Sequence, residues 1–189
     1  MKHADLPVLV GIVGKKNSGK TTLLVGVAAE LKRRGLRVAS VKHGHHEFEI
    51  DHVGRDSWRH VHEGGAEAVL LISSAKMAMV MQLPEGEPRL EELVARHLGG
   101  RRYDVVLVEG YKHGDLPKIE IHRAGMHDRP VYDLSDEAAA ARFIAIVTDD
   151  PALRTDCTLI PLDVADPAGS HVLAVADLVA AVVAGSTDG

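Results

Sequence analysis

The sequence has a single cysteine, Cys157, among 189 residues. One cysteine excludes a disulfide framework and any Cys-x-x-Cys metal or redox motif, and it suits a reducing cytoplasm. Aromatic side chains make up only 3% of the chain, so Val, Leu, Ile and Ala must form the core. The chain also lacks a secretory signal pattern and any apolar run of the roughly 20 residues that cross a membrane. These absences predict a cytoplasmic protein with no membrane segment.

Positive charge is also scarce overall, since the formal net charge is -5. This balance argues against nonspecific nucleic-acid binding. The distribution is uneven, however: residues 1–62 hold 11 Lys/Arg and 6 Asp/Glu, whereas residues 63–189 hold 11 and 21. An anionic ligand is therefore expected in the first third. Length and composition together predict one globular domain over residues 1–189.

What the sequence does contain is an alternation of apolar strands and amphipathic helices. Residues 7–13 read as a buried strand, residues 21–34 as a helix and residues 37–42 as a second strand, which makes a βαβ unit. Further strands are expected over residues 68–73, 77–83, 105–108, 118–122, 143–148 and 158–162, and further helices over 57–63, 89–98 and 172–184. The prediction is an α/β fold with a mostly parallel sheet flanked by helices and an antiparallel hairpin at 68–83.

A phosphate-binding loop joins the first strand to the first helix. Gly14-Lys15-Lys16-Asn17-Ser18-Gly19-Lys20-Thr21 fits the Walker A pattern G-x-x-x-x-G-K-[ST]. Its glycines let successive N–H groups turn inward around an anion, and the helix N-terminus adds a positive dipole end. We expect Lys20 to reach the β- and γ-phosphates, the Thr21 hydroxyl to bind Mg²⁺ and Thr22 to hold the α-phosphate. The Rossmann pattern G-x-G-x-x-G is absent, which disfavours a nicotinamide site.

A P-loop also needs a carboxylate for Mg²⁺. Glu109 follows four apolar residues and is expected at the carboxyl end of a central strand, where α/β sheets bind ligands. Asp51 is a second candidate, either as a switch-type Mg²⁺ or water ligand or as a surface acid. Asp149 follows a late strand, where an acid could accept hydrogen bonds from guanine. Lys20, Glu109 and Asp51 are thus the candidate catalytic residues, and Thr21, Glu109 and Asp51 the candidate metal ligands.

Histidine is unusually frequent, with 12 in the chain. Three of them, His43, His45 and His46, fall in the loop after the second strand. They are candidates for a metal site, for contacts to a nucleotide or pterin from a switch loop, or for solvated loop residues. Adjacent histidines without cysteines suit a closed zinc site poorly, so a ligand contact by His43 and His45 is favoured.

Five segments, in order and spacing, resemble the molybdopterin-guanine dinucleotide biosynthesis protein B (MobB) family. They are residues 14–22, 41–46, 51–57, 108–112 and 117–123. The resemblance implies a P-loop GTPase fold, binding of GTP and Mg²⁺, a homodimer and at most weak GTP hydrolysis. It also implies partnership with the guanylyltransferase MobA, which joins GMP to molybdopterin.

The resemblance further assigns residues. It maps the nucleotide loop to residues 14–22 and the Walker B-like acid to Glu109. It also points to Lys112, Lys118 and Arg123 as basic residues that bind phosphates of molybdopterin or its guanine dinucleotide, or that form dimer salt bridges. In related partitioning ATPases a lysine at the Lys15 position reaches a partner's phosphates across a dimer. The neighbouring Lys16 favours a solvated lysine here.

Three functions are compatible with these features. The leading one is a GTP-binding accessory protein in guanylation of molybdopterin. The alternative is a nickel-type metallochaperone GTPase that uses the histidine loop. A small-molecule kinase is disfavoured because residues 123–142 hold too few arginines for a phosphate-covering lid.

Overall fold

The computed structural model describes residues 6–44, 50–166 and 169–187. The chain forms two compact units, one made of the residues up to 43 together with those from 93 onward, and the other of residues 44–92. The second unit is therefore inserted into the sequence of the first. The single domain expected over residues 1–189 stays a prediction, because a compact unit need not fold alone.

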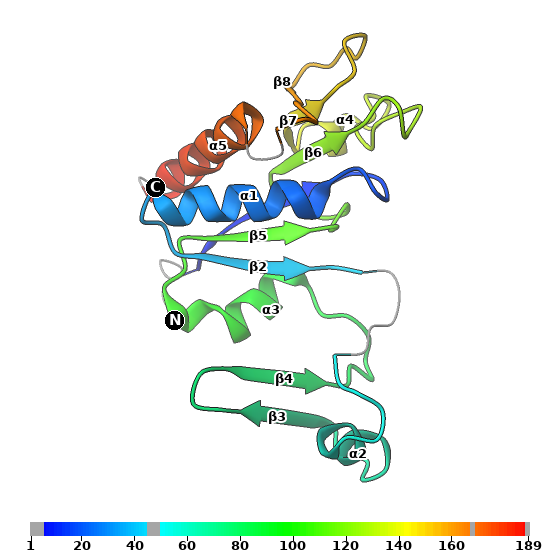
Figure 1. Cartoon of the computed structure of the whole chain (residues 1–189), viewed down its shortest axis with the longest axis vertical. Helices are drawn as coiled ribbons and strands as arrows, with labels where there is room; N and C mark the ends of the chain where they lie inside the picture. Colours follow the sequence, from blue (N-terminus) through cyan, green and yellow to red (C-terminus); the bar gives the residue numbers. More distant parts are fainter. Residues whose placement is uncertain (1–5, 45–49, 167–168, 188–189) are drawn as a thin grey trace. The chain divides into compact units, whose positions relative to one another are not determined.

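The first unit is built on a six-stranded sheet in the order β2-β5-β1-β6-β7-β8, with every neighbouring pair parallel (Figure 1). Its strands are β1 (Val8–Val13), β2 (Val38–Lys42), β5 (Val105–Glu109), β6 (Lys118–His122), β7 (Phe143–Thr148) and β8 (Thr158–Pro161). β5 and β6 are buried along their whole length, as expected for the middle of a parallel sheet. The predicted α/β class with a mostly parallel sheet is confirmed.

Two long helices pack together with the sheet in one apolar core (Figure 1). They are α1 (Lys20–Arg33) and α5 (Ser170–Thr187). Leu23, Val27 and Leu31 recur every four residues on α1, so they share one face and are buried. α1 ends where Gly35 adopts a φ of +90° and the Leu36 N–H bonds back to the Leu31 carbonyl at 3.1 Å. In the described residues no helix is long and apolar enough to cross a membrane.

The segment between β6 and β7, for which the sequence predicts no element, forms a second, smaller apolar cluster. Tyr132 and Phe143 meet edge to face at 5.4 Å and pack with Val13 and Ile146. On β7, Ile146 of this cluster alternates with Ala145 and Val147 of the main core, so its side chain lies on the opposite side of the strand from that core. Of the remaining short elements, α4 (Glu137–Ala140) lies in this segment. The other two precede β5: the helix α3 (Leu90–His97), which crosses the boundary between the two units, and the 3₁₀ turn Gly99–Arg101.

The second unit contains a helix and a hairpin. They are α2 (Asp56–His62), β3 (Ala68–Ile72) and β4 (Met77–Met81), and the two strands pair antiparallel as predicted. No residue of α2 is buried. One face of the hairpin carries Leu70, Ile72, Met77, Met79 and Met81, all between 40% and 73% exposed. We name these five residues the hairpin face.

Candidate functional site

The loop between β1 and α1 has the backbone geometry of an anion cradle. Gly14, Asn17 and Gly19 all have positive φ, at 148°, 63° and 104°. A Cβ on Gly14 would lie 2.5 Å from the Ile121 carbonyl oxygen and 2.7 Å from Ser18 Oγ, so only glycine fits. The tight turn brings the loop to the N-terminus of α1, where unpaired N–H groups and the helix dipole favour an anion.

Lys20 opens α1 and folds over this loop. Its Nζ donates to the Lys15 carbonyl oxygen at 2.6 Å. Burial lowers the pKa of the Lys20 ammonium; the Glu109 carboxylate opposes this effect, and the Lys112 and Lys42 ammoniums add to it. Three lysines are therefore close enough to repel one another, and a polyanion between them would relieve the repulsion.

Thr21 and Glu109 meet beside the loop. Thr21 Oγ1 lies 3.0 Å from each carboxylate oxygen of Glu109 and donates to them. Glu109 is buried at the carboxyl end of β5, and Lys42 ends the adjacent strand with its Nζ 3.9 Å from Glu109 Oε1. A hydroxyl and a carboxylate are oxygen ligands of the kind Mg²⁺ prefers, alongside waters and phosphates. The donor set thus fits a Mg²⁺ ion bound together with a nucleotide.

A tight turn after Glu109 joins β5 to the end of β2. The Glu109 carbonyl accepts from the His43 N–H at 2.9 Å, and Gly110 has a φ of +87°. A Cβ on Gly110 would lie 2.6 Å from the His43 carbonyl oxygen, so glycine is required there. The His43 ring packs edge-on against Tyr111 at 5.2 Å between ring centres. The structure therefore brings His43 to the strand ends that carry Glu109.

A cavity of about 490 Å³ lies beside the loop and the Thr21–Glu109 contact. It is bounded by Lys16, Asn17, Gly19, Lys20, Thr21, Thr22, Lys42 and Glu109. The volume lies in the range of about 300–1,000 Å³ usual for small-molecule sites. Polar and cationic groups line it, which matches a phosphate chain better than an apolar ligand.

Asp149 and Arg123 lie together at the ends of neighbouring strands. Arg123 Nε donates to Asp149 Oδ2 at 2.9 Å, and the Ala124 N–H donates to Oδ1 at 2.8 Å. Burial opposes ionisation of this carboxyl, but these hydrogen bonds prevail and hold the pKa of Asp149 below its ordinary value. Both oxygens are thus engaged within the protein. A base contact by Asp149 stays a prediction and would require the Arg123 pair to rearrange.

One predicted site residue, Lys118, lies at the end of β6 opposite the loop. Lys118 is buried at the amino end of β6, and its Nζ donates to the Gly114 carbonyl at 2.7 Å. Burial, and to a lesser extent Arg142, lower the pKa of Lys118. Asp51 belongs to the second unit, where its Oδ1 accepts from the His52 N–H. His45 and His46 lie outside the described residues.

The metal hypothesis for the histidine loop stays a prediction, because His45 and His46 lie outside the described residues. The part of the chain that the structure describes contains no group of three His, Cys, Asp or Glu side chains placed to hold a metal ion. In α2, His62 stacks on Trp58 at 4.2 Å between ring centres.

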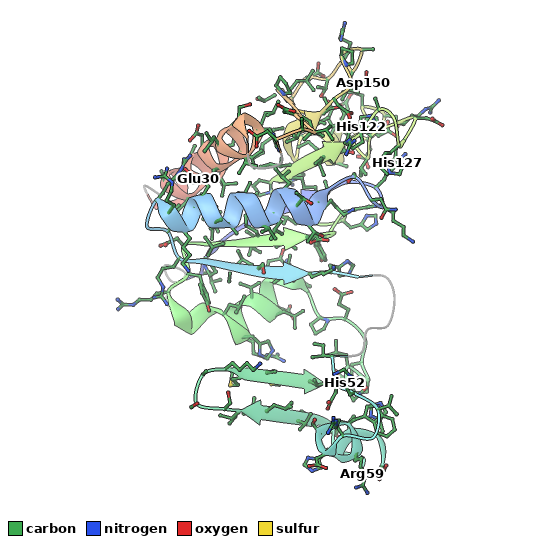
Figure 2. All side chains as sticks on the ribbon, viewed as in Figure 1. Glu30, His52, Arg59, His122, His127 and Asp150 are labelled. Atoms are coloured by element: carbon green, nitrogen blue, oxygen red, sulfur yellow. The ribbon has the colours of Figure 1, made fainter. Side chains whose placement is uncertain are left out.

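β6 carries a row of buried polar side chains that the sequence does not predict. Glu120 accepts the Val131 and Tyr132 N–H groups at 2.5 and 2.8 Å, and burial raises the pKa of its carboxyl. His122, also buried, lies 4.0 Å from Asp150, and nearby His127 donates from Nε2 to the Lys16 carbonyl at 2.7 Å (Figure 2). The His127 contact ties residues 123–132 to the phosphate loop, and the Glu120 contacts tie them to β6. Polar and apolar residues alternate along β6, but this pattern is typical of a strand with one solvated face and does not indicate buried polar side chains.

The family model for molybdopterin guanine dinucleotide synthesis protein B, MobB, matches residues 9–149. The chain belongs to the MobB family. Its matched region runs from β1 through the loop and Glu109 to Asp149, so the predicted resemblance is confirmed. Membership supports a role in molybdenum cofactor biosynthesis and does not support the nickel-type metallochaperone alternative.

Individual MobB relatives agree with this assignment. The molybdopterin-guanine dinucleotide biosynthesis adapter protein of Haemophilus influenzae is 36% identical over 155 residues, which cover 82% of each chain. The adapter protein of Escherichia coli K12 is 31% identical over 155 residues, or 82% of this chain and 85% of that one. A crystal structure of molybdopterin-guanine biosynthesis protein B superposes with a TM-score of 0.65 and 26% identity, covering 92% of this chain and 99% of that chain.

Proposed function

We propose that the protein binds GTP with Mg²⁺ and acts as an accessory protein in guanylation of molybdopterin to its guanine dinucleotide, as a partner of the guanylyltransferase MobA. The observation that carries the proposal is the Thr21–Glu109 contact beside a glycine-built loop in a chain of the MobB family. A phosphate cradle and a magnesium-type donor pair meet there in one cavity. The single cysteine of the chain agrees with a cytoplasmic location in this proposal.

Each residue of the cavity has a role in this proposal. The loop N–H groups and Lys20 hold the β- and γ-phosphates, and Thr22 holds the α-phosphate. Thr21 and Glu109 position Mg²⁺, which would neutralise charge on the phosphate chain when bound. Lys42 adds positive charge beside Glu109, and Lys112 adds positive charge near Lys20. Arg123 and Lys112 are the remaining candidates for the phosphates of a pterin.

Titration of the protein with GTP in the presence of Mg²⁺ tests the nucleotide site. We expect Lys20→Ala to weaken GTP binding by about a hundredfold or more, because it removes charge-assisted bonds to two phosphates. Lys32→Ala, an exposed lysine further along α1, is the matched control and should bind as the unaltered protein does. Full affinity in Lys20→Ala would overturn the loop assignment, and ATP binding as tight as GTP would overturn the guanine assignment.

Hydrolysis is expected to be weak at most. The family resemblance implies at most weak hydrolysis, and Lys20 and Glu109 are the candidate catalytic residues that line the cavity. Phosphate release measured with and without MobA tests this. Rapid turnover of GTP by the isolated protein would contradict an accessory role and favour an enzyme.

We also propose that the protein is a homodimer and that the hairpin face is buried between its copies. A two-stranded hairpin alone is only marginally stable in water. Burial of the five exposed apolar side chains on one face in a permanent interface would stabilise it. A second copy is always present at equal concentration and offers the same apolar surface, as in an isologous interface.

Sedimentation analysis of two hairpin variants tests the dimer. Met79→Asp places a charge on the hairpin face and should shift the protein to monomer. Ala78→Asp is one residue away on the opposite face of β4, so it should leave the dimer intact. Loss of the dimer in both variants, or in neither, would contradict this placement of the interface.

A further inference from the structure

A second cavity adjoins the phosphate cavity at the start of α1. Its volume is about 120 Å³, and Gly19 and Thr22 line both cavities. Since Thr22 stands at the expected α-phosphate position, the second cavity lies where the nucleoside of a bound nucleotide would continue. It is smaller than the roughly 300–1,000 Å³ of a site for a whole ligand, so it suits a single ring system.

Two buried side chains of this cavity have polar atoms without partners. His171, the second residue of α5, and Ser18 of the loop are both almost completely buried. Within the described ranges, His171 Nδ1 and Ser18 Oγ make no hydrogen bond. Buried polar atoms are normally paired, and an unpaired one is costly. A ligand with its own donors and acceptors would therefore be stabilised here.

Apolar side chains, Asp163 and Arg123 complete the cavity. The Arg123 Nε donates to Asp149 Oδ2 at 2.9 Å. Ile121, Leu162 and Val164 provide apolar walls, and Asp163 follows β8 at the rim. Asp163 Oδ1 accepts the Ala165 N–H at 2.8 Å, and across the described residues its Oδ2 accepts no hydrogen bond. Asp163 thus differs from Asp149, whose two oxygens are both engaged.

We propose that this cavity binds the guanine base of the nucleotide, with Asp163 as the acid that selects guanine and His171 as a polar anchor for the nucleoside. The inference rests on the proposed GTP binding and names its specificity residues. Guanine presents two adjacent donors, N1–H and the 2-amino group, which one carboxylate can accept together. Adenine has no N–H at position 1 and no 2-amino group, so it cannot make this pair.

Replacing guanine by xanthine provides a sharp probe of Asp163. Xanthine carries a carbonyl where guanine carries the 2-amino group, and a carboxylate repels that oxygen while an amide N–H can donate to it. We therefore expect Asp163→Asn to weaken GTP binding by about tenfold to a hundredfold and to bind XTP more tightly than GTP. The amide oxygen of asparagine can still accept the Ala165 N–H, so the local turn is retained.

Two further variants separate the roles. Asp149→Asn removes the competing acid, whose partner Arg123 lines the cavity, and should not reverse the preference for GTP over XTP. His171→Phe removes the anchoring nitrogen and should weaken GTP and XTP in parallel, by about tenfold, without changing their ratio. Circular dichroism of each variant confirms that it is folded.

The outcomes distinguish this inference from the proposed function. If Asp163→Asn binds GTP and XTP as the unaltered protein does, or if Asp149→Asn is the variant that gains XTP, the inference is wrong while GTP binding stands. If the unaltered protein binds neither GTP nor XTP with Mg²⁺, the proposed function itself fails. The inference is supported if Lys20→Ala abolishes binding of both nucleotides and only Asp163→Asn reverses the order of their affinities.

Discussion

Leu107 in β5 and Leu70 in β3 are the same side chain in the middle of a strand, yet Leu107 is fully buried and Leu70 is 49% exposed. Leu107 belongs to the apolar core that α1 and α5 share with the parallel sheet. Leu70 lies on the hairpin face, where β3 pairs only with β4. The difference between the two units is therefore one of coverage, since both strands are strongly apolar in sequence.

The difference in coverage suits the two units to different roles. The first unit holds the phosphate loop, Thr21 and Glu109 on elements that a buried core fixes in place, and a rigid core is what a preorganised binding site requires. The second unit offers apolar surface with little core beneath it. Such a surface is typical of a segment that is completed by association.

The largest expected difference is in stability. Leu107→Ala should lower the free energy of unfolding by about 2–5 kcal/mol, because it removes buried methyl groups and leaves a cavity. Leu70→Ala should change the unfolding of the monomer by less than about 1 kcal/mol, because its side chain is half exposed. Urea denaturation of both variants at a low protein concentration measures the two effects.

The same denaturation at high concentration sharpens the comparison. If the hairpin face is covered by a second copy, Leu70→Ala should become more destabilising as the protein concentration rises, whereas the effect of Leu107→Ala should stay constant. Equal effects of both substitutions at low concentration would mean that the hairpin has a core of its own.

The geometry of the loop and its neighbours could be predicted from the sequence because its parts are local. Loop, lysine and threonine are contiguous, and Glu109 follows from the rule that ligands lie at the carboxyl ends of strands. The same rule places Lys118 elsewhere, since a residue that begins β6 lies at the opposite end of a parallel sheet from the loop. The family resemblance points to Lys118, but a resemblance does not say at which end of a strand a residue lies.

Contacts made by the segment after β6 could not be predicted. Glu120 is satisfied by N–H groups 11 and 12 residues away, and Asp149 by Arg123, 26 residues away. The hydrophobic periodicity of a sequence does not predict such pairs, because they depend on how residues 123–142 fold back over β6 and β7. The exposure of the hairpin face was equally hidden, since an apolar strand reads the same whether it is covered or not.

The next largest effect concerns magnesium. Glu109→Gln should weaken GTP binding in Mg²⁺ by about tenfold, because a neutral amide is a poorer partner for the cation. In excess chelator the variant and the unaltered protein should bind GTP alike. Calorimetric titration under both conditions measures the difference, and Thr21→Ser, which keeps the hydroxyl, is the matched control. A loss of affinity that is the same with and without Mg²⁺ would contradict the metal role.

A smaller, pH-dependent effect is expected at Glu120. Burial raises the pKa of this carboxyl in the folded protein, so folding favours its protonated form. Its contribution to stability is fully present below the unfolded pKa of about 4.5 and is lost as pH rises through the folded pKa. Relative to Glu120→Gln, the unaltered protein should therefore lose stability as pH rises above 4.5. Urea denaturation over a pH series checks the sign, and a constant difference between the two proteins would contradict it.

The smallest effect is expected at the ion pair between Arg59 of α2, labelled in Figure 2, and Glu63, which follows the helix. Arg59 Nε lies 2.8 Å from Glu63 Oε2, and both side chains are more than half exposed. Glu63→Gln should change the free energy of unfolding by less than about 0.5 kcal/mol, because water and salt screen such pairs. The arginine also precedes the glutamate, which is the weaker order against the helix dipole. Added salt should abolish even this difference. A larger loss, retained in salt, would mean that α2 is covered in the assembled protein, and the contrast between the units would then extend beyond the hairpin face to the whole second unit.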